Sequence, residues 1–159
     1  MPSIEIKLTE DSIGDAVKAV RKYAKWVTKK EAELRTRLAA LGANVASIEF
    51  AGAMYTGTND VTVRVDNTGS VAVIYAEGEA VAFIEFGTGA THGYGHPQAA
   101  QFGVGPGTYP DGKGHWDDPN GWWYAGKHTY GNVPAMAMYK AVQEIAEKVT
   151  EIAKEVFAT

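Results

Sequence analysis

The stretch that decides the fold is IGDAVKAVRKYAKWVTKKEAELRTRLAAL, which occupies residues 13–41. Its apolar side chains recur at alternating spacings of four and three residues, the periodicity of one helix face, and Glu31 interrupts the stripe once. The polar residues 9–12 are typical of a helix start, and Gly42 is typical of a helix end. The pattern predicts a helix of about 29 residues, roughly 43 Å long. This exceeds what the core of a 159-residue chain needs, so we expect part of the helix to pack against something else.

Extended segments are expected after this helix, at residues 45–55, 61–66, 71–76 and 80–86. Only short turn-like runs separate them, so they predict a four-stranded antiparallel meander. Valines alternate with polar residues in 61–66, which indicates a strand at or near an edge, whereas 71–76 is apolar on both faces and indicates a central strand. A second helix is expected over 134–157, with Pro134 at its first position and an apolar stripe that covers the sheet or the first helix. The predicted fold class is α+β, with the C-terminal helix packed on the sheet.

Residues 88–132 form a long segment without periodicity. They hold 11 of the 18 glycines, three of the four tryptophans and all four histidines. A loop of this length inside a domain is usually functional or disordered, and its aromatic side chains argue against permanent disorder. We expect a single domain over residues 1–159 in which this loop becomes ordered in an assembly.

Composition and charge exclude several classes of protein. Hydrophobic residues make up 45% of the chain and charged residues 21%, as in globular proteins. The absence of cysteine excludes disulfides, thiolate metal sites and cysteine nucleophiles. No apolar run approaches the ~20 residues that span a bilayer, so we expect a protein that is cytoplasmic when made and has no membrane partner. The net charge of -4 disfavours a uniformly basic nucleic-acid-binding domain, although residues 1–41 carry nine Lys or Arg against six Asp or Glu.

Two short motifs carry a resemblance to a known family. The first is FIEFGTG at residues 83–89, and the second is GNVPA at residues 131–135. Together with the order of elements, they resemble the tail-component proteins of long-tailed phages that complete the tail or join it to the head. The family motif residues are Phe83, Glu85, Phe86, Gly87, Thr88, Gly89, Pro134 and Ala135. The family usually shows Pro-Ala-x-Pro-Phe at the second motif, whereas residues 134–138 read PAMAM here, which leaves the start of the helix open.

The resemblance implies a structural subunit of the virion tail or neck, not an enzyme. Such subunits form rings, commonly of six copies, through which DNA passes, and they contact adjacent tail or connector proteins. No cofactor is implied. The basic residues of the long helix either line this passage or form an ordinary solvated face. They are Lys18, Arg21, Lys22, Lys25, Lys29 and Arg35.

The aromatic loop offers other interpretations. Its interface candidates are Trp116, Trp122, Trp123 and Tyr124. The same side chains could stack on sugars, which makes a carbohydrate-binding module the alternative from another class. A weaker alternative is a small metal-dependent hydrolase that uses loop residues His92, His96, His115 and Asp117. We expect Glu85 to be structural and to accept hydrogen bonds from the backbone N–H groups of residues 87–89.

Overall fold

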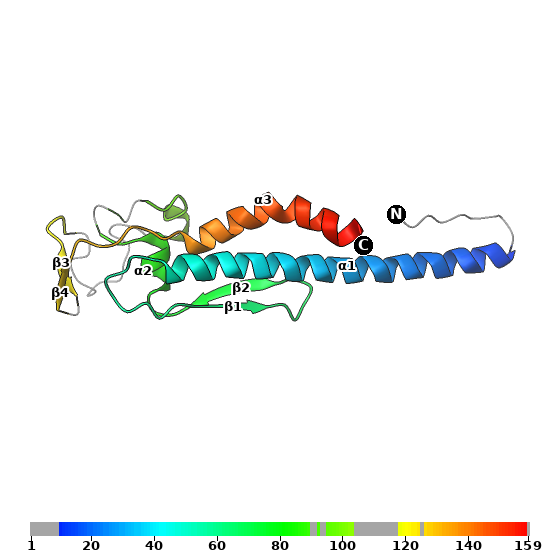
Figure 1. Cartoon of the computed structure of the whole chain (residues 1–159), viewed down its shortest axis with the longest axis horizontal. Helices are drawn as coiled ribbons and strands as arrows, with labels where there is room; N and C mark the ends of the chain where they lie inside the picture. Colours follow the sequence, from blue (N-terminus) through cyan, green and yellow to red (C-terminus); the bar gives the residue numbers. More distant parts are fainter. Residues whose placement is uncertain (1–9, 90–91, 93–94, 104–117, 125, 159) are drawn as a thin grey trace.

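The computed structural model describes residues 10–89, 92, 95–103, 118–124 and 126–158. Their elements, in chain order, are α1 (Glu10–Ala51), β1 (Thr62–Asp66), β2 (Val73–Glu77), α2 (Val81–Phe86), the short 3-10 helix η1 (Ala100–Phe102), β3 (Trp122–Tyr124), β4 (Lys127–Thr129) and α3 (Ala137–Ala158). The predicted α+β class is confirmed, because long N- and C-terminal helices accompany two antiparallel two-stranded sheets in this part of the chain. α1 forms the axis of an elongated molecule. α3 and the β1–β2 hairpin lie along it, and the other elements gather near its C-terminal end (Figure 1).

α1 has 42 residues and continues through Gly42, so the prediction that this glycine ends the helix is wrong. A Cβ atom at residue 42 would lie 2.6 Å from Cδ1 of Ile145 and 2.6 Å from Cδ1 of Ile74. The glycine is needed because side chains from α3 and β2 press against the backbone of α1. Glycine costs about 1 kcal/mol relative to alanine inside a helix, and this packing offsets the cost.

Two of the predicted strands are present, and two are wrong. β1 and β2 pair as an antiparallel hairpin that begins with Thr62 opposite Glu77, which confirms 61–66 and 71–76 as partners. Helices occupy most of the predicted strands at 45–55 and 80–86, because α1 continues to Ala51 and α2 forms over Val81–Phe86. In the described part of the chain β2 pairs with β1 alone, so the predicted central strand and the four-stranded meander are wrong.

The core lies where α1, α2 and α3 meet. Its buried side chains are Ala46, Phe50, Ala80, Ile84, Ala137 and Ala141. Most of them are alanines, whose small side chains let the helices approach closely. The apolar runs at 45–55 and 80–86 do not distinguish a strand from a buried helix, because short apolar runs suit both. This three-helix contact accounts for their helical form.

α3 starts later and packs differently from the sequence prediction. It begins at Ala137, so the expectation of Pro134 at its first position is wrong. It packs chiefly along α1, which confirms the first helix as its partner and corrects its placement on the sheet. The apolar residue Val142 of α3 is 64% exposed, whereas its neighbour Ala141 is buried.

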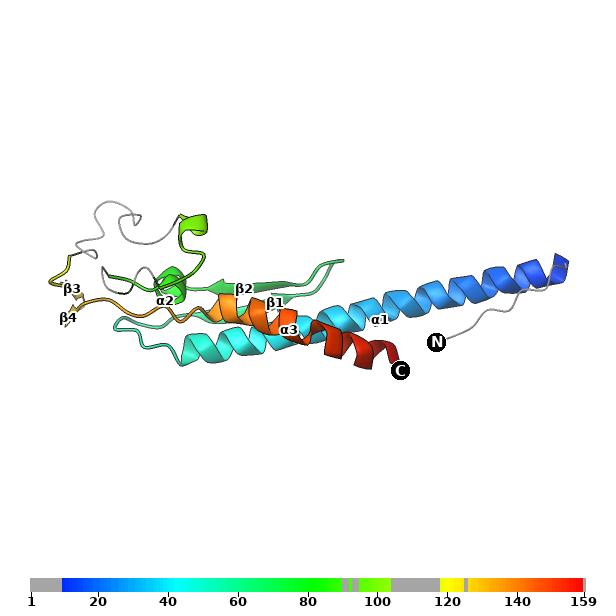
Figure 2. The ribbon, with the colours of Figure 1, turned by 90° about the horizontal axis from the view of Figure 1, so that it is seen from above.

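The N-terminal part of α1 extends past the end of α3, as both views show (Figures 1 and 2). Near the end of α3, Trp26 contacts Phe157 edge to face, with 5.8 Å between the ring centroids. We call residues 10–25 of α1 the projecting segment. Among the residues the structure describes, no helix combines the length and the apolar content that a bilayer span requires.

Candidate functional site

The two family-like motifs meet in space, although they lie 44 residues apart in sequence. The backbone N–H of Thr88 donates to the Asn132 carbonyl at 3.0 Å, and the N–H of Asn132 donates to the Thr88 carbonyl at 3.2 Å. The side chains repeat the link, because the Thr88 hydroxyl donates to Asn132 Oδ1 at 2.5 Å. Asn132 Nδ2 donates to the Phe83 carbonyl at 2.9 Å. We call this meeting of 83–89 with 131–139 the junction.

Glycines permit the close approach of the two chains at the junction. A Cβ atom at Gly89 would lie 2.2 Å from the carbonyl oxygen of Tyr130, and one at Gly131 would lie 2.0 Å from that of Thr88. Both residues also have positive φ angles, 88° and 98°, which side chains rarely adopt. Gly89 and Gly131 are therefore required by the backbone geometry of the junction.

Glu85 is the central side chain of the junction, and it is only 5% exposed. Its Oε2 accepts the backbone N–H of Met138 at 2.9 Å, and its Oε1 accepts that of Tyr139 at 3.0 Å. These N–H groups belong to the first turn of α3, where a carboxylate satisfies free donors and complements the helix dipole. The predicted acceptance from residues 87–89 is wrong, because the carboxylate points at the start of α3.

His96 completes this buried cluster and is itself 5% exposed. Its Nδ1 accepts the backbone N–H of Gln98 at 3.1 Å, which leaves the proton on Nε2. Nε2 lies 3.3 Å from Glu85 Oε1 and donates to it. The ring also contacts Phe86, with 4.5 Å between centroids. Both ring nitrogens and both carboxylate oxygens are thus engaged, an arrangement that holds the loop and is not open to a metal or a substrate.

The hydrolase interpretation gains no support from the described residues. In this part of the chain, no three His, Cys, Asp or Glu side chains converge as metal ligands would. His115 and Asp117 lie outside the described residues. His92 lies in a turn, where its backbone carbonyl accepts the N–H of Gly95 at 3.1 Å.

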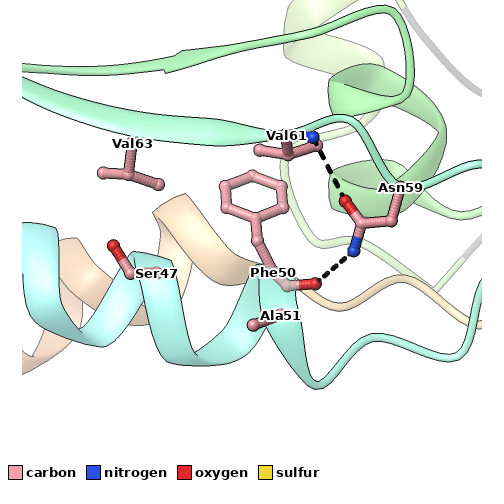
Figure 3. Close-up of a pocket in the computed structure, with 6 residues that line it drawn as sticks. All are labelled: Ser47, Phe50, Ala51, Asn59, Val61 and Val63. Carbon is pink, nitrogen blue, oxygen red and sulfur yellow. Dashed lines mark hydrogen bonds between the residues drawn. The ribbon is translucent and has the colours of Figure 1, made fainter.

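A small hollow lies beside the C-terminal end of α1 (Figure 3). Phe50, Asn59 and Val61 are among its lining residues, and its volume is about 290 Å³. The Asn59 amide is engaged on both sides, since it donates to the Phe50 carbonyl at 2.8 Å and accepts the Val61 N–H at 3.2 Å. None of the lining residues carries a charge, so the hollow has little chemistry to offer.

The predicted interface residues that the structure describes lie in the β3–β4 hairpin and differ in exposure. Trp122 is half-buried opposite Thr129, whereas Trp123 is 73% exposed and pairs with His128. The His128 ring packs edge-on against Trp123 at 5.4 Å. Tyr124 ends β3, and Trp116 lies outside the described residues. The hairpin lies at the end of the molecule opposite the projecting segment (Figure 1).

The candidate DNA-facing residues of α1 also differ in their contacts and exposure. Arg35 Nε donates to Asn67 Oδ1 at 3.0 Å and its Nη1 donates to the Ser70 carbonyl at 3.1 Å, so it fastens the β1–β2 turn to α1. Arg35 is therefore engaged within the chain, and its contact with DNA in an assembly stays a prediction. The other candidates are exposed. They are Lys18, which pairs with Asp15 at 3.1 Å, and Arg21, Lys22, Lys25 and Lys29.

No family model matches this chain, and neither the curated proteins nor the solved structures contain a match.

Proposed function

We propose that this chain is a structural subunit of a phage tail or head-to-tail connector, which forms a ring and contacts neighbouring virion proteins. It would act in the tail or neck of the virion, after synthesis in the host cytoplasm. The motif residues that carry the family resemblance support this proposal, because they build one buried junction that sets the loop and α3 in place.

The observation that carries the proposal is that apolar side chains are exposed at both ends of an elongated molecule. At one end Trp123 is 73% exposed and Tyr130 is 60% exposed. At the other end Ile13 is 57% exposed and Val20 is 53% exposed. Large exposed apolar surfaces mark contact sites, and aromatic residues dominate the energetics of such contacts. A subunit completed by its neighbours has this distribution.

We propose that one face of α1, in the projecting segment and the helical turns that follow it, lines the DNA passage. Lys18, Lys22 and Lys25 recur at spacings of four and three, so they share one helix face. In a ring, such a face turned inward would attract the phosphate backbone without reading sequence.

The test is the mass of the native particle, together with electron microscopy for a ring. Trp123→Ala is expected to leave unfolding stability within about 1 kcal/mol, as for exposed positions, and to weaken assembly strongly. Tyr75→Ala is the matched control, because Tyr75 is an exposed aromatic residue on β2. If the Trp123 variant assembles as strongly as the wild type, the β3–β4 hairpin is not part of the contact surface.

A carbohydrate-binding module is the second candidate, because the exposed ring of Trp123 could also stack on a sugar. Glycan binding that Trp123→Ala abolishes, in a chain that stays monomeric, would favour this candidate over the assembly subunit.

A further inference from the structure

The projecting segment carries an apolar stripe that none of the residues described by the structure packs against closely enough to bury. Ile13, Val17 and Val20 are 57%, 45% and 53% exposed. Their spacings of four and three place them on one face of α1, opposite the lysine face. We call these three residues the stripe.

An apolar groove lies further along the same helix. It has a volume of about 400 Å³ and is lined by Leu34 and Leu38 of α1, Val71 and Ile74 of the hairpin and Ile145 of α3, with Glu31 and Arg35 also contributing. Val71 is 65% exposed at its edge. The groove is thus built from three elements and remains open to solvent.

The stripe and the groove belong to one row of α1. Continuing the spacing from Val20 through Ala24 and Val27 leads to Leu34 and Leu38, so the same helix face changes from exposed stripe to groove wall. α1 is one continuous helix, so its own stripe cannot fold back into its own groove.

We propose that the groove receives the stripe of a second copy of this chain. One contact would then cover both apolar surfaces, which a different partner would have to cover separately. Charge supports this choice. Arg21 flanks the stripe of one copy. The Glu31 side chain at the groove of the other copy is 63% exposed and can form an ion pair with this Arg21, in addition to its 3.6 Å ion pair with Arg35. The inference rests on the proposed self-assembly and names the surfaces that perform it.

Two variants separate the halves of this contact. The stripe variant is Val17→Glu with Val20→Glu, and the groove variant is Val71→Glu. All three positions are exposed, so the chain should fold in both cases. The matched control is Ile48→Glu, because Ile48 is 61% exposed on α1 and does not line the groove.

Analytical ultracentrifugation, with circular dichroism as the check on folding, tests the proposal. Each variant alone is expected to self-associate at least about tenfold more weakly than the wild type, while the control assembles normally. An equimolar mixture of the two variants is expected to form a complex with the mass of two chains, because each supplies the half that the other lacks.

The outcomes separate this inference from the proposed function. If the wild type assembles and both variants keep its mass, the groove contact is wrong while ring formation stands. The inference also fails if the variants are monomers whose mixture remains monomeric. A wild-type chain that stays monomeric up to its solubility limit overturns the groove contact together with self-assembly.

Discussion

Removing the Glu85 carboxylate tests whether the junction positions α3. In Glu85→Ala, the N–H groups of Met138 and Tyr139 and the Nε2–H of His96 lose their acceptor inside a buried site. Loss of a helix cap costs about 0.5–2 kcal/mol, and each buried donor left unsatisfied costs about 1–3 kcal/mol. These effects overlap, so we expect a loss of roughly 3–5 kcal/mol in the free energy of unfolding, within the range seen when a buried network is broken.

Urea unfolding followed by far-ultraviolet circular dichroism measures this loss, at a concentration where the chain is monomeric. Glu85→Gln should lose less, about 1–3 kcal/mol, because it keeps one acceptor oxygen. Glu147→Ala is the matched control on α3. Its side chain is exposed, and we expect a change within about 0.5 kcal/mol.

Hydrogen exchange locates the effect. The amides of Met138 and Tyr139 should lose protection first in Glu85→Ala, because they are the donors that lose their acceptor. A loss below about 1 kcal/mol, or unchanged exchange at these amides, would show that the carboxylate does not hold the start of α3.

Three further predictions concern other parts of the molecule. Charge reversal by Lys22→Glu with Lys25→Glu should spare the fold by circular dichroism and lower the yield of infectious particles; an unchanged yield would end the proposal that these residues line a DNA passage. Backbone N–H donation, from Ala80 above all, lowers the pKa of Asp60 below its ordinary 3.8, so its stabilisation is present above pH 3.8 and is lost as pH falls through the lower folded pKa. Asp60→Asn should therefore flatten this acid-side loss in a pH series of thermal unfolding. Gly131→Ala should destabilise the chain by about 2 kcal/mol or more, because its Cβ would lie 2.0 Å from a carbonyl oxygen at a φ of 98°, and unchanged thermal unfolding would contradict the close approach at the junction.

Periodicity predicted the long helices, because a single helix face repeats over many residues. The apolar helix face within residues 13–41 and the hairpin partners at 61–66 and 71–76 could be found from such patterns. The end of α1 could not be predicted from the sequence. A glycine such as Gly42 looks the same in the sequence whether it ends a helix or leaves room for side chains of α3 and β2. The apolar run at 80–86 was equally ambiguous, since burial on several sides removes the alternation that identifies a strand.

For the candidate site, the sequence singled out Glu85 and the two glycine-containing motifs but not their partner. The expectation that a buried carboxylate needs backbone donors was sound, yet the donors proved to lie 53 and 54 residues away, on α3. His96 was considered as a metal ligand, whereas the fold uses it to hold Glu85. Local sequence carries no signal for such a pairing, because chain topology brings the groups together.

The sequence by itself determined the α+β class, the excess length of α1 and the two motifs that meet at the junction, because these depend on local periodicity and on short motifs. Only the tertiary structure decided that the stripe stays exposed, that the groove forms further along the same helix, and that Arg35 fastens a hairpin turn while Lys18, Lys22, Lys25 and Lys29 are exposed. These features depend on how α3 and the β1–β2 hairpin pack along α1, which is set by contacts between elements distant in sequence.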